Sequence, residues 1–124
     1  MSLGEHGFRF EVKFEKDPKR IAEKVAEQVD EVLKMYEGRV DVANIKLLLV
    51  VAFEDISPLF KTMEFTSFKE PLNVADARAK LVNEVREWLA EQLSNTQAVN
   101  ARLREIHLSI SVESNPYRSW FSTL

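Results

Sequence analysis

The chain has 124 residues, of which 45% are hydrophobic and 30% charged, the size and composition of one ordinary globular domain. It contains no cysteine, so disulfides, thiol nucleophiles and zinc–thiolate sites are excluded. The formal net charge is −3 with both signs interspersed, which argues against a surface for nucleic acid or anionic membranes.

Neither a membrane span nor a secretory signal is visible in the sequence. The longest apolar run, residues 47–53, is far shorter than the roughly 20 residues that a membrane helix requires. The N-terminus lacks the basic and then apolar pattern of a signal peptide. We therefore expect a soluble, cytoplasmic protein that forms a single domain over residues 1–124.

The first predicted element is a β-strand over residues 7–15. Apolar residues alternate there with charged ones, which is the period of two of a strand with one dry and one wet face. Residues 105–113 repeat this alternation near the other end of the chain. Two such strands predict an antiparallel sheet that is covered on one side.

A helix is predicted to begin at Asp17-Pro18, where a capping side chain precedes a proline in the first turn. Gly38 is its expected end, because glycine readily adopts the left-handed geometry that follows a last turn. The apolar residues between them fall on one helical face: Ile21, Val25, Val29, Val32, Leu33 and Tyr36.

The second strand is predicted over residues 44–54. Unlike the first strand, it is apolar on both faces, which predicts cover on both sides. In the usual spatial order of the expected fold, this strand lies at an edge of the sheet.

Residues 56–71 permit two interpretations. Ser57-Pro58 could start a short helix, yet residues 61–69 also fit an irregular strand with Met63 and Phe65 on its inner face. We prefer the strand. A second long helix follows, capped by Asn73 or Asp76, and its buried stripe is expected to contain Leu81, Val85, Trp88, Leu89 and Leu93.

The resulting order of strand, helix, two strands, helix and strand predicts an α+β fold. With short connections it is the ferredoxin-like βαββαβ arrangement, a four-stranded antiparallel sheet with two helices on one face. The alternative is a three-stranded sheet with an extra short helix. Residues 114–124 form an aromatic C-terminal tail after the last strand.

No residue set in the sequence marks a catalytic, cofactor or metal site. The three glycines do not cluster as a phosphate-binding loop requires. Of the two histidines, His6 lies in what we expect to be a loose N-terminus and His107 on the wet face of the last strand. We therefore expect no cofactor and favour a role other than catalysis.

Recognition of RNA on the open face of such a sheet requires aromatic side chains for base stacking. The open face of the first strand carries Arg9, Glu11 and Lys13 instead, so we expect no nucleic-acid partner.

What remains unusual is apolar surface. An exposed apolar patch marks an interface, and the second strand presents one on its outer side. We therefore predict a non-catalytic protein-protein interaction module that self-associates, or binds another protein, through the open face and the tail. The predicted interface residues are Leu48, Val50, Ala52, Tyr117, Trp120, Phe121 and Leu124.

The alternative is a small-molecule binder or enzyme of the dimeric ferredoxin-like kind. It would have a pocket between helices and sheet, near residues such as Trp88, His107 and Tyr36.

Overall fold

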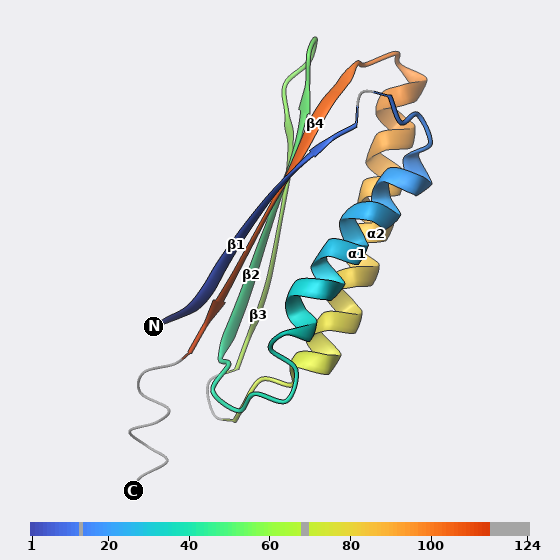
Figure 1. Cartoon of the computed structure of the whole chain (residues 1–124). Coiled ribbons are helices and arrows are strands. Elements are labelled where there is room, and N and C mark those ends of the chain that lie inside the picture. Colours follow the sequence, from blue (N-terminus) through green and yellow to red (C-terminus); the bar gives the residue numbers. More distant parts are fainter. Residues whose placement is uncertain (13, 68–69, 115–124) are drawn as a thin grey trace, which may run out of the picture.

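The computed structural model describes residues 1–12, 14–67 and 70–114. Six elements follow one another in the order β1, α1, β2, β3, α2 and β4 (Figure 1). Their bounds are Ser2–Glu11, Pro18–Lys34, Asn44–Phe53, Leu59–Thr66, Val74–Ala98 and Leu103–Glu113. Neither helix within these ranges has the length and apolar character needed to cross a membrane.

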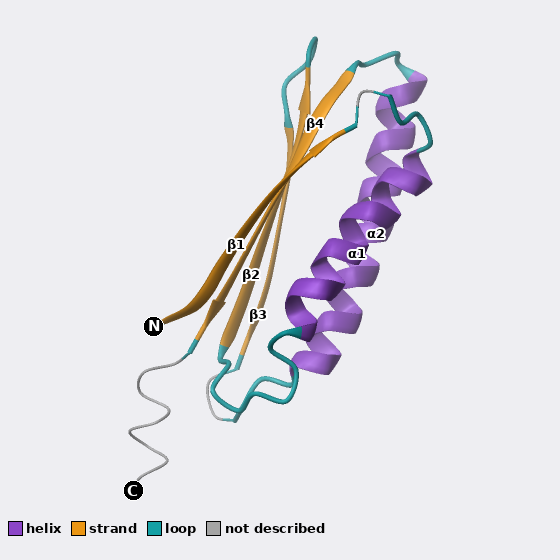
Figure 2. Ribbon diagram, in the orientation of Figure 1, coloured by secondary structure: helices purple, strands orange, loops and turns teal. Residues whose placement is uncertain are grey.

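The predicted α+β fold is confirmed. The four strands form one antiparallel sheet, and both helices lie on one of its faces (Figure 2). Local signals place the helices as predicted: the Asp17 side chain accepts a hydrogen bond from the Lys19 amide at 3.1 Å, and Asn73 accepts one from the Asp76 amide at 3.1 Å. The preferred strand at residues 59–66 is also present.

The order of the strands differs from the one expected. It is β1-β4-β2-β3, so β2 lies inside the sheet between β4 and β3, and the edges are β1 and β3. The expectation of an edge position for β2 is therefore wrong. The expected cover on both faces of β2 is not found among the described residues, because the helices cover only its inner face (Figure 2) and Leu48 on the outer face is 37% exposed.

The core lies between the helices and the inner face of the sheet. Val25, Val29 and Leu33 of α1 are fully buried there, opposite alternate residues of β2 and β4. Phe14 is an exception to the predicted alternation: β1 ends at Glu11, and this phenylalanine is 90% exposed.

The N-terminus is more ordered than expected, because β1 begins at Ser2 and includes His6. The His6 Nε2 atom lies 2.7 Å from the Tyr36 hydroxyl oxygen, a hydrogen bond that joins the strand to the end of α1. Tyr36 is buried and lies over Gly4, whose missing side chain leaves room for the phenol. This close approach explains the glycine in a strand interior.

Candidate functional site

The face of the sheet that the helices leave uncovered is the largest functional candidate, and we call it the open face. Alternation of buried and exposed residues along each strand identifies its members. They are Glu5, Gly7, Arg9 and Glu11 on β1; Glu105, His107, Ser109, Ser111 and Glu113 on β4; Asn44, Lys46, Leu48, Val50 and Ala52 on β2; and Phe60, Thr62, Glu64 and Thr66 on β3.

Strand register arranges these side chains in rows that cross the sheet. One row contains Arg9, His107, Val50 and Phe60, in the order β1, β4, β2 and β3. The next row contains Gly7, Ser109, Leu48 and Thr62, and the third contains Glu5, Ser111, Lys46 and Glu64. The open face is therefore mostly polar, and its apolar side chains on β2 include Leu48 and Val50.

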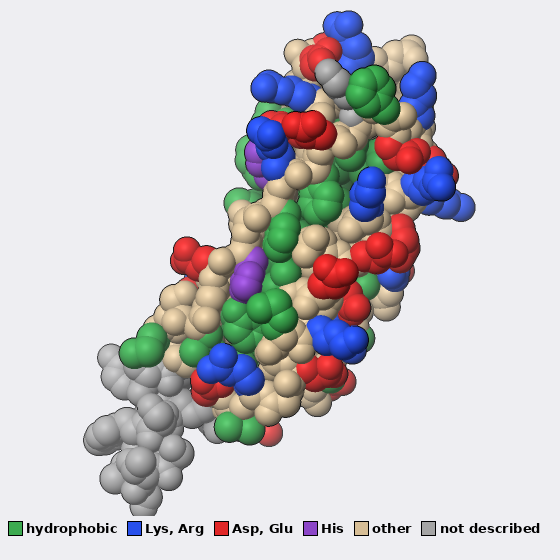
Figure 3. Space-filling model, viewed as in Figure 1, with side chains coloured by type: hydrophobic (Ala, Val, Ile, Leu, Met, Phe, Trp, Pro, Cys, Tyr) green, Lys and Arg blue, Asp and Glu red, His purple; other side chains and the backbone are tan. Residues whose placement is uncertain are grey.

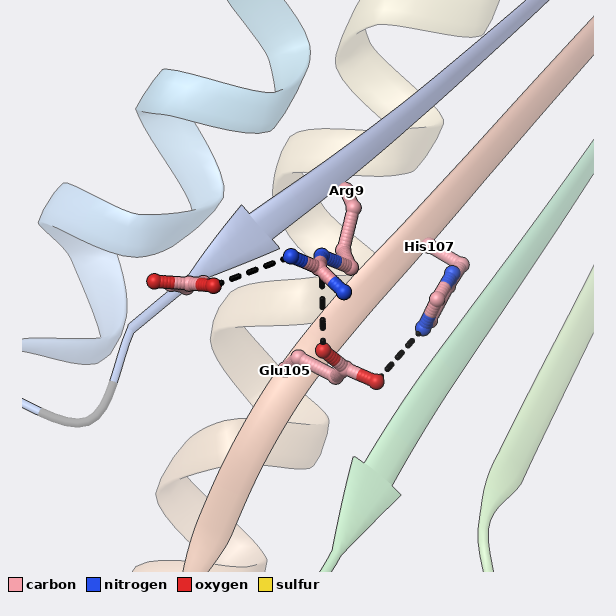
Figure 4. A network of polar contacts seen from close by, with 4 residues as sticks. Arg9, Glu105 and His107 are labelled. Carbon is pink, nitrogen blue, oxygen red and sulfur yellow. Dashed lines mark hydrogen bonds and ion pairs between the residues drawn. The ribbon is translucent and has the colours of Figure 1, made fainter.

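A polar network joins β1 to β4 at one end of this face (Figure 4). Arg9 lies 3.1 Å from Glu11 and 3.7 Å from Glu105, and the His107 Nε2 atom lies 2.9 Å from the other carboxylate oxygen of Glu105. The hydrogen bond from His107 is the main cause that lowers the pKa of Glu105, and the charges of His107 and Arg9 add to it. Glu105 is therefore ionised at neutral pH and fixes the orientation of the imidazole.

An open hollow of about 800 Å³ lies over the middle of the face. Gly7 and the small side chains of Ser109 and Ser111 leave this room, and the charged residues Glu5, Lys46 and Glu64 also line the hollow. Glu64 accepts a hydrogen bond of 2.7 Å from Asn44. This bond, together with one from Thr66, lowers the pKa of Glu64.

Acidic groups outnumber cations on the open face. Arg9 and Lys46 are its lysine and arginine residues, against Glu5, Glu11, Glu64, Glu105 and Glu113. The side of the molecule seen in Figure 3 is mixed as well, because blue and red side chains lie among one another there without a wide field of one sign. Electrostatic attraction for a polyanion is consequently small and local.

The structure places the predicted interface residues in two groups. Leu48, Val50 and Ala52 lie on the open face, as the alternation of the strand indicated, and Leu48 is 37% exposed. The predicted residues Tyr117, Trp120, Phe121 and Leu124 lie outside the described residues.

The alternative pocket between helices and sheet does not form around its proposed residues. Tyr36 is buried at the end of α1, Trp88 packs against the core from α2, and His107 points away from both on the open face. Among the described residues, no group of three or more His, Asp and Glu side chains converges as metal ligands would.

Sequence reasoning missed the network of Arg9, Glu105 and His107. Glu105 and His107 are neighbours on one face of β4, but Arg9 lies nearly 100 positions away in sequence and meets them only through the register of β1 against β4. The alternation of each strand did place all three on the wet face, and this is the only signal that the sequence offers.

Comparison with known proteins finds solved structures with a similar fold. No protein-family model matches the sequence, and no curated protein is similar to it. Similar solved structures are an insertion ternary complex of Dbh DNA polymerase (TM-score 0.50), a post-insertion binary complex of the same enzyme (0.51) and a Y-family DNA polymerase chimera of Dbh and Dpo4 (0.50). Each is 18% identical to this chain.

The matches cover 90% to 93% of this chain but only 29% to 30% of the polymerase chains. The chain thus spans less than a third of the proteins that it resembles in fold. At this level of identity the likeness concerns the fold.

These neighbours correct two predictions made from the sequence. The self-associating interaction module, with a small-molecule binder or enzyme as alternative, is wrong. The exclusion of nucleic acid as a partner is wrong as well, because the similar structures named above are of DNA polymerases. The exclusion relied on net charge and on missing aromatic residues on β1 alone. The ring-bearing side chains of the open face lie on other strands than β1: His107 is on β4 and Phe60 is on β3.

Proposed function

We propose that this chain is a nucleic-acid-contacting domain associated with DNA synthesis, and that the open face is its contact surface. The likeness to part of a DNA polymerase supports an accessory role rather than the chemical step. The observation that carries the proposal is the side-chain content of the open face.

The side chains of the open face include residue types that commonly donate hydrogen bonds to a DNA phosphate backbone. Half or more of protein–DNA hydrogen bonds go to phosphate and sugar, and Ser, Thr, Asn, Lys and Arg side chains supply many of them. The hollow presents Ser109, Ser111, Thr62 and Lys46 together across three neighbouring strands, and the carboxylates of Glu5 and Glu64 also line it. Because a sheet holds these groups on a rigid frame, they form a positioning surface.

The charge balance limits the strength of this contact. Arg9 and Lys46 can neutralise about two phosphates, so the logarithm of the association constant should fall with the logarithm of salt concentration with a slope of about −2. The carboxylates repel phosphate, although Glu105 and Glu64 are partly compensated by their hydrogen-bond donors. We expect the isolated chain to bind with a Kd in the range of non-specific contacts, about 10⁻⁴ to 10⁻⁶ M.

Fluorescence anisotropy of labelled DNA at about 50 mM salt tests the proposal. Lys46→Glu should weaken binding and reduce the salt slope by about 1, because it removes a phosphate contact. The matched control is Lys19→Glu, which makes the same charge change at an exposed position on the helix layer. Equal losses in both variants would show non-specific attraction and remove the open face from the contact. No binding in the parent chain would refute the proposed function itself.

A further inference from the structure

Two ring side chains lie in one row on the open face, separated by a single apolar residue. His107 of β4 and Phe60 of β3 flank Val50 of β2, and each is the register partner of Val50. Neighbouring strands lie about 4.8 Å apart, so the two rings are about 10 Å apart across the sheet. Phe60 is 62% exposed and the His107 side chain 45% exposed, so both rings are accessible to a ligand.

We propose that this row is a base-stacking platform and that the nucleic acid it takes is single-stranded DNA. The inference rests on the proposed function and names its substrate class. Aromatic rings on a sheet bind unpaired bases by stacking, and a four-stranded sheet can stack two or three of them. Bases in a duplex already stack on one another, so the faces of exposed rings have no partner there.

The fixed orientation of His107 supports this assignment. An ionised carboxylate only accepts hydrogen bonds, so the contact of 2.9 Å requires that Nε2 of His107 donates to Glu105. Arg9 holds the second oxygen of Glu105 from β1, at 3.7 Å. The imidazole is therefore held in place before any ligand arrives, which reduces the entropy lost on binding.

Val50 and Arg9 complete the row. Val50 presents an apolar side chain between the two rings, against which the bound DNA strand can pack. Arg9 lies beyond His107 on the edge strand β1, where it can contact a phosphate. Lys46 lies four residues from Val50 along β2, about 13 Å away, and offers a second phosphate contact. Base stacking does not depend on a positively charged surface, so it is compatible with an open face that carries few cations.

The test compares a labelled oligothymidine of about twelve nucleotides with a duplex of the same length in anisotropy titrations. We expect the single strand to bind more tightly. Phe60→Leu, which keeps an apolar side chain but removes the ring, should weaken single-strand binding about tenfold. His107→Ala should have a similar effect, whereas His107→Phe should lose less affinity than His107→Ala, because it keeps a ring but not the hydrogen bond to Glu105.

The matched control is Val40→Ala, which trims an apolar side chain that is 72% exposed in the loop after α1 and should change nothing. Circular dichroism confirms that each variant is folded. Preference for the duplex, or a Phe60→Leu variant that binds the single strand as the parent does, would overturn the stacking platform and leave the proposed function standing. Failure to bind either DNA would refute both.

Discussion

Two neighbouring residues of β2 offer a sharp test of which face of the sheet is packed. Leu49 is fully buried beneath the helices and pairs in register with Leu108, whereas Val50 lies on the open face. Leu49→Ala removes buried methyl groups and leaves a cavity, which costs about 3 kcal/mol of unfolding free energy. Val50→Ala removes half-exposed methyl groups and should cost about 1 kcal/mol or less.

Thermal denaturation followed by circular dichroism distinguishes the two variants. In a domain of this size 1 kcal/mol corresponds to about 4 °C in Tm, so we expect a fall of about 12 °C for Leu49→Ala and at most about 4 °C for Val50→Ala. Equal shifts, or a larger one for Val50→Ala, would mean that the face assignment of β2 is wrong. Every row of the open face would then be wrong with it, because a slip of one residue exchanges the two faces of a strand.

Two further predictions concern the helix layer and the first strand. Gly4→Ala should lower the unfolding free energy by about 1–3 kcal/mol, because the new Cβ would overlap the Tyr36 hydroxyl, whereas Gly7→Ala, with nothing within 4 Å, should be neutral in the same thermal melt. The hydrogen bond from Arg86 lowers the pKa of Glu23 below its ordinary 4.5, so its stabilisation is present above that value and is lost as the pH falls through the lowered pKa. Urea denaturation from about pH 6 to pH 3 should show a shallower acid decline for Glu23→Gln than for the parent, and identical declines would contradict the ion pair between the helices.

Local patterns predicted the elements of this fold and most of its core. The stripe of α1 at Val25, Val29 and Leu33 was visible because helical periodicity depends only on spacing in the sequence. Strand order was not predictable in this way, since the choice of neighbour depends on contacts between distant residues. β2 was therefore expected at an edge, and its two apolar faces could not correct this, because they predict cover of the faces and not the neighbours of the strand in the sheet.

The candidate site was predictable only residue by residue. Alternation assigned Leu48, Val50 and His107 to the outer face, and the structure places them there. The row that joins His107 to Phe60 depends on the register of β2 with two partners, which no local pattern specifies. Gly4 shows the same limit, because its role depends on Tyr36, more than 30 positions away.

The interior position of β4 has a consequence for how the chain is made. β4 follows the other strands of this sheet in the sequence and joins β1 to the β2–β3 hairpin, so β1 has no hydrogen-bonding partner in the sheet until residues 103–113 have been synthesised. Pairing of residues about 100 positions apart gives a high contact order, which slows folding. During this delay β1 presents two unpaired edges and the apolar side chains of Phe8 and Phe10. Until β4 is in place, β1 is thus a strand of this sheet at risk of aggregation, and pairing with β4 removes one of its two open edges.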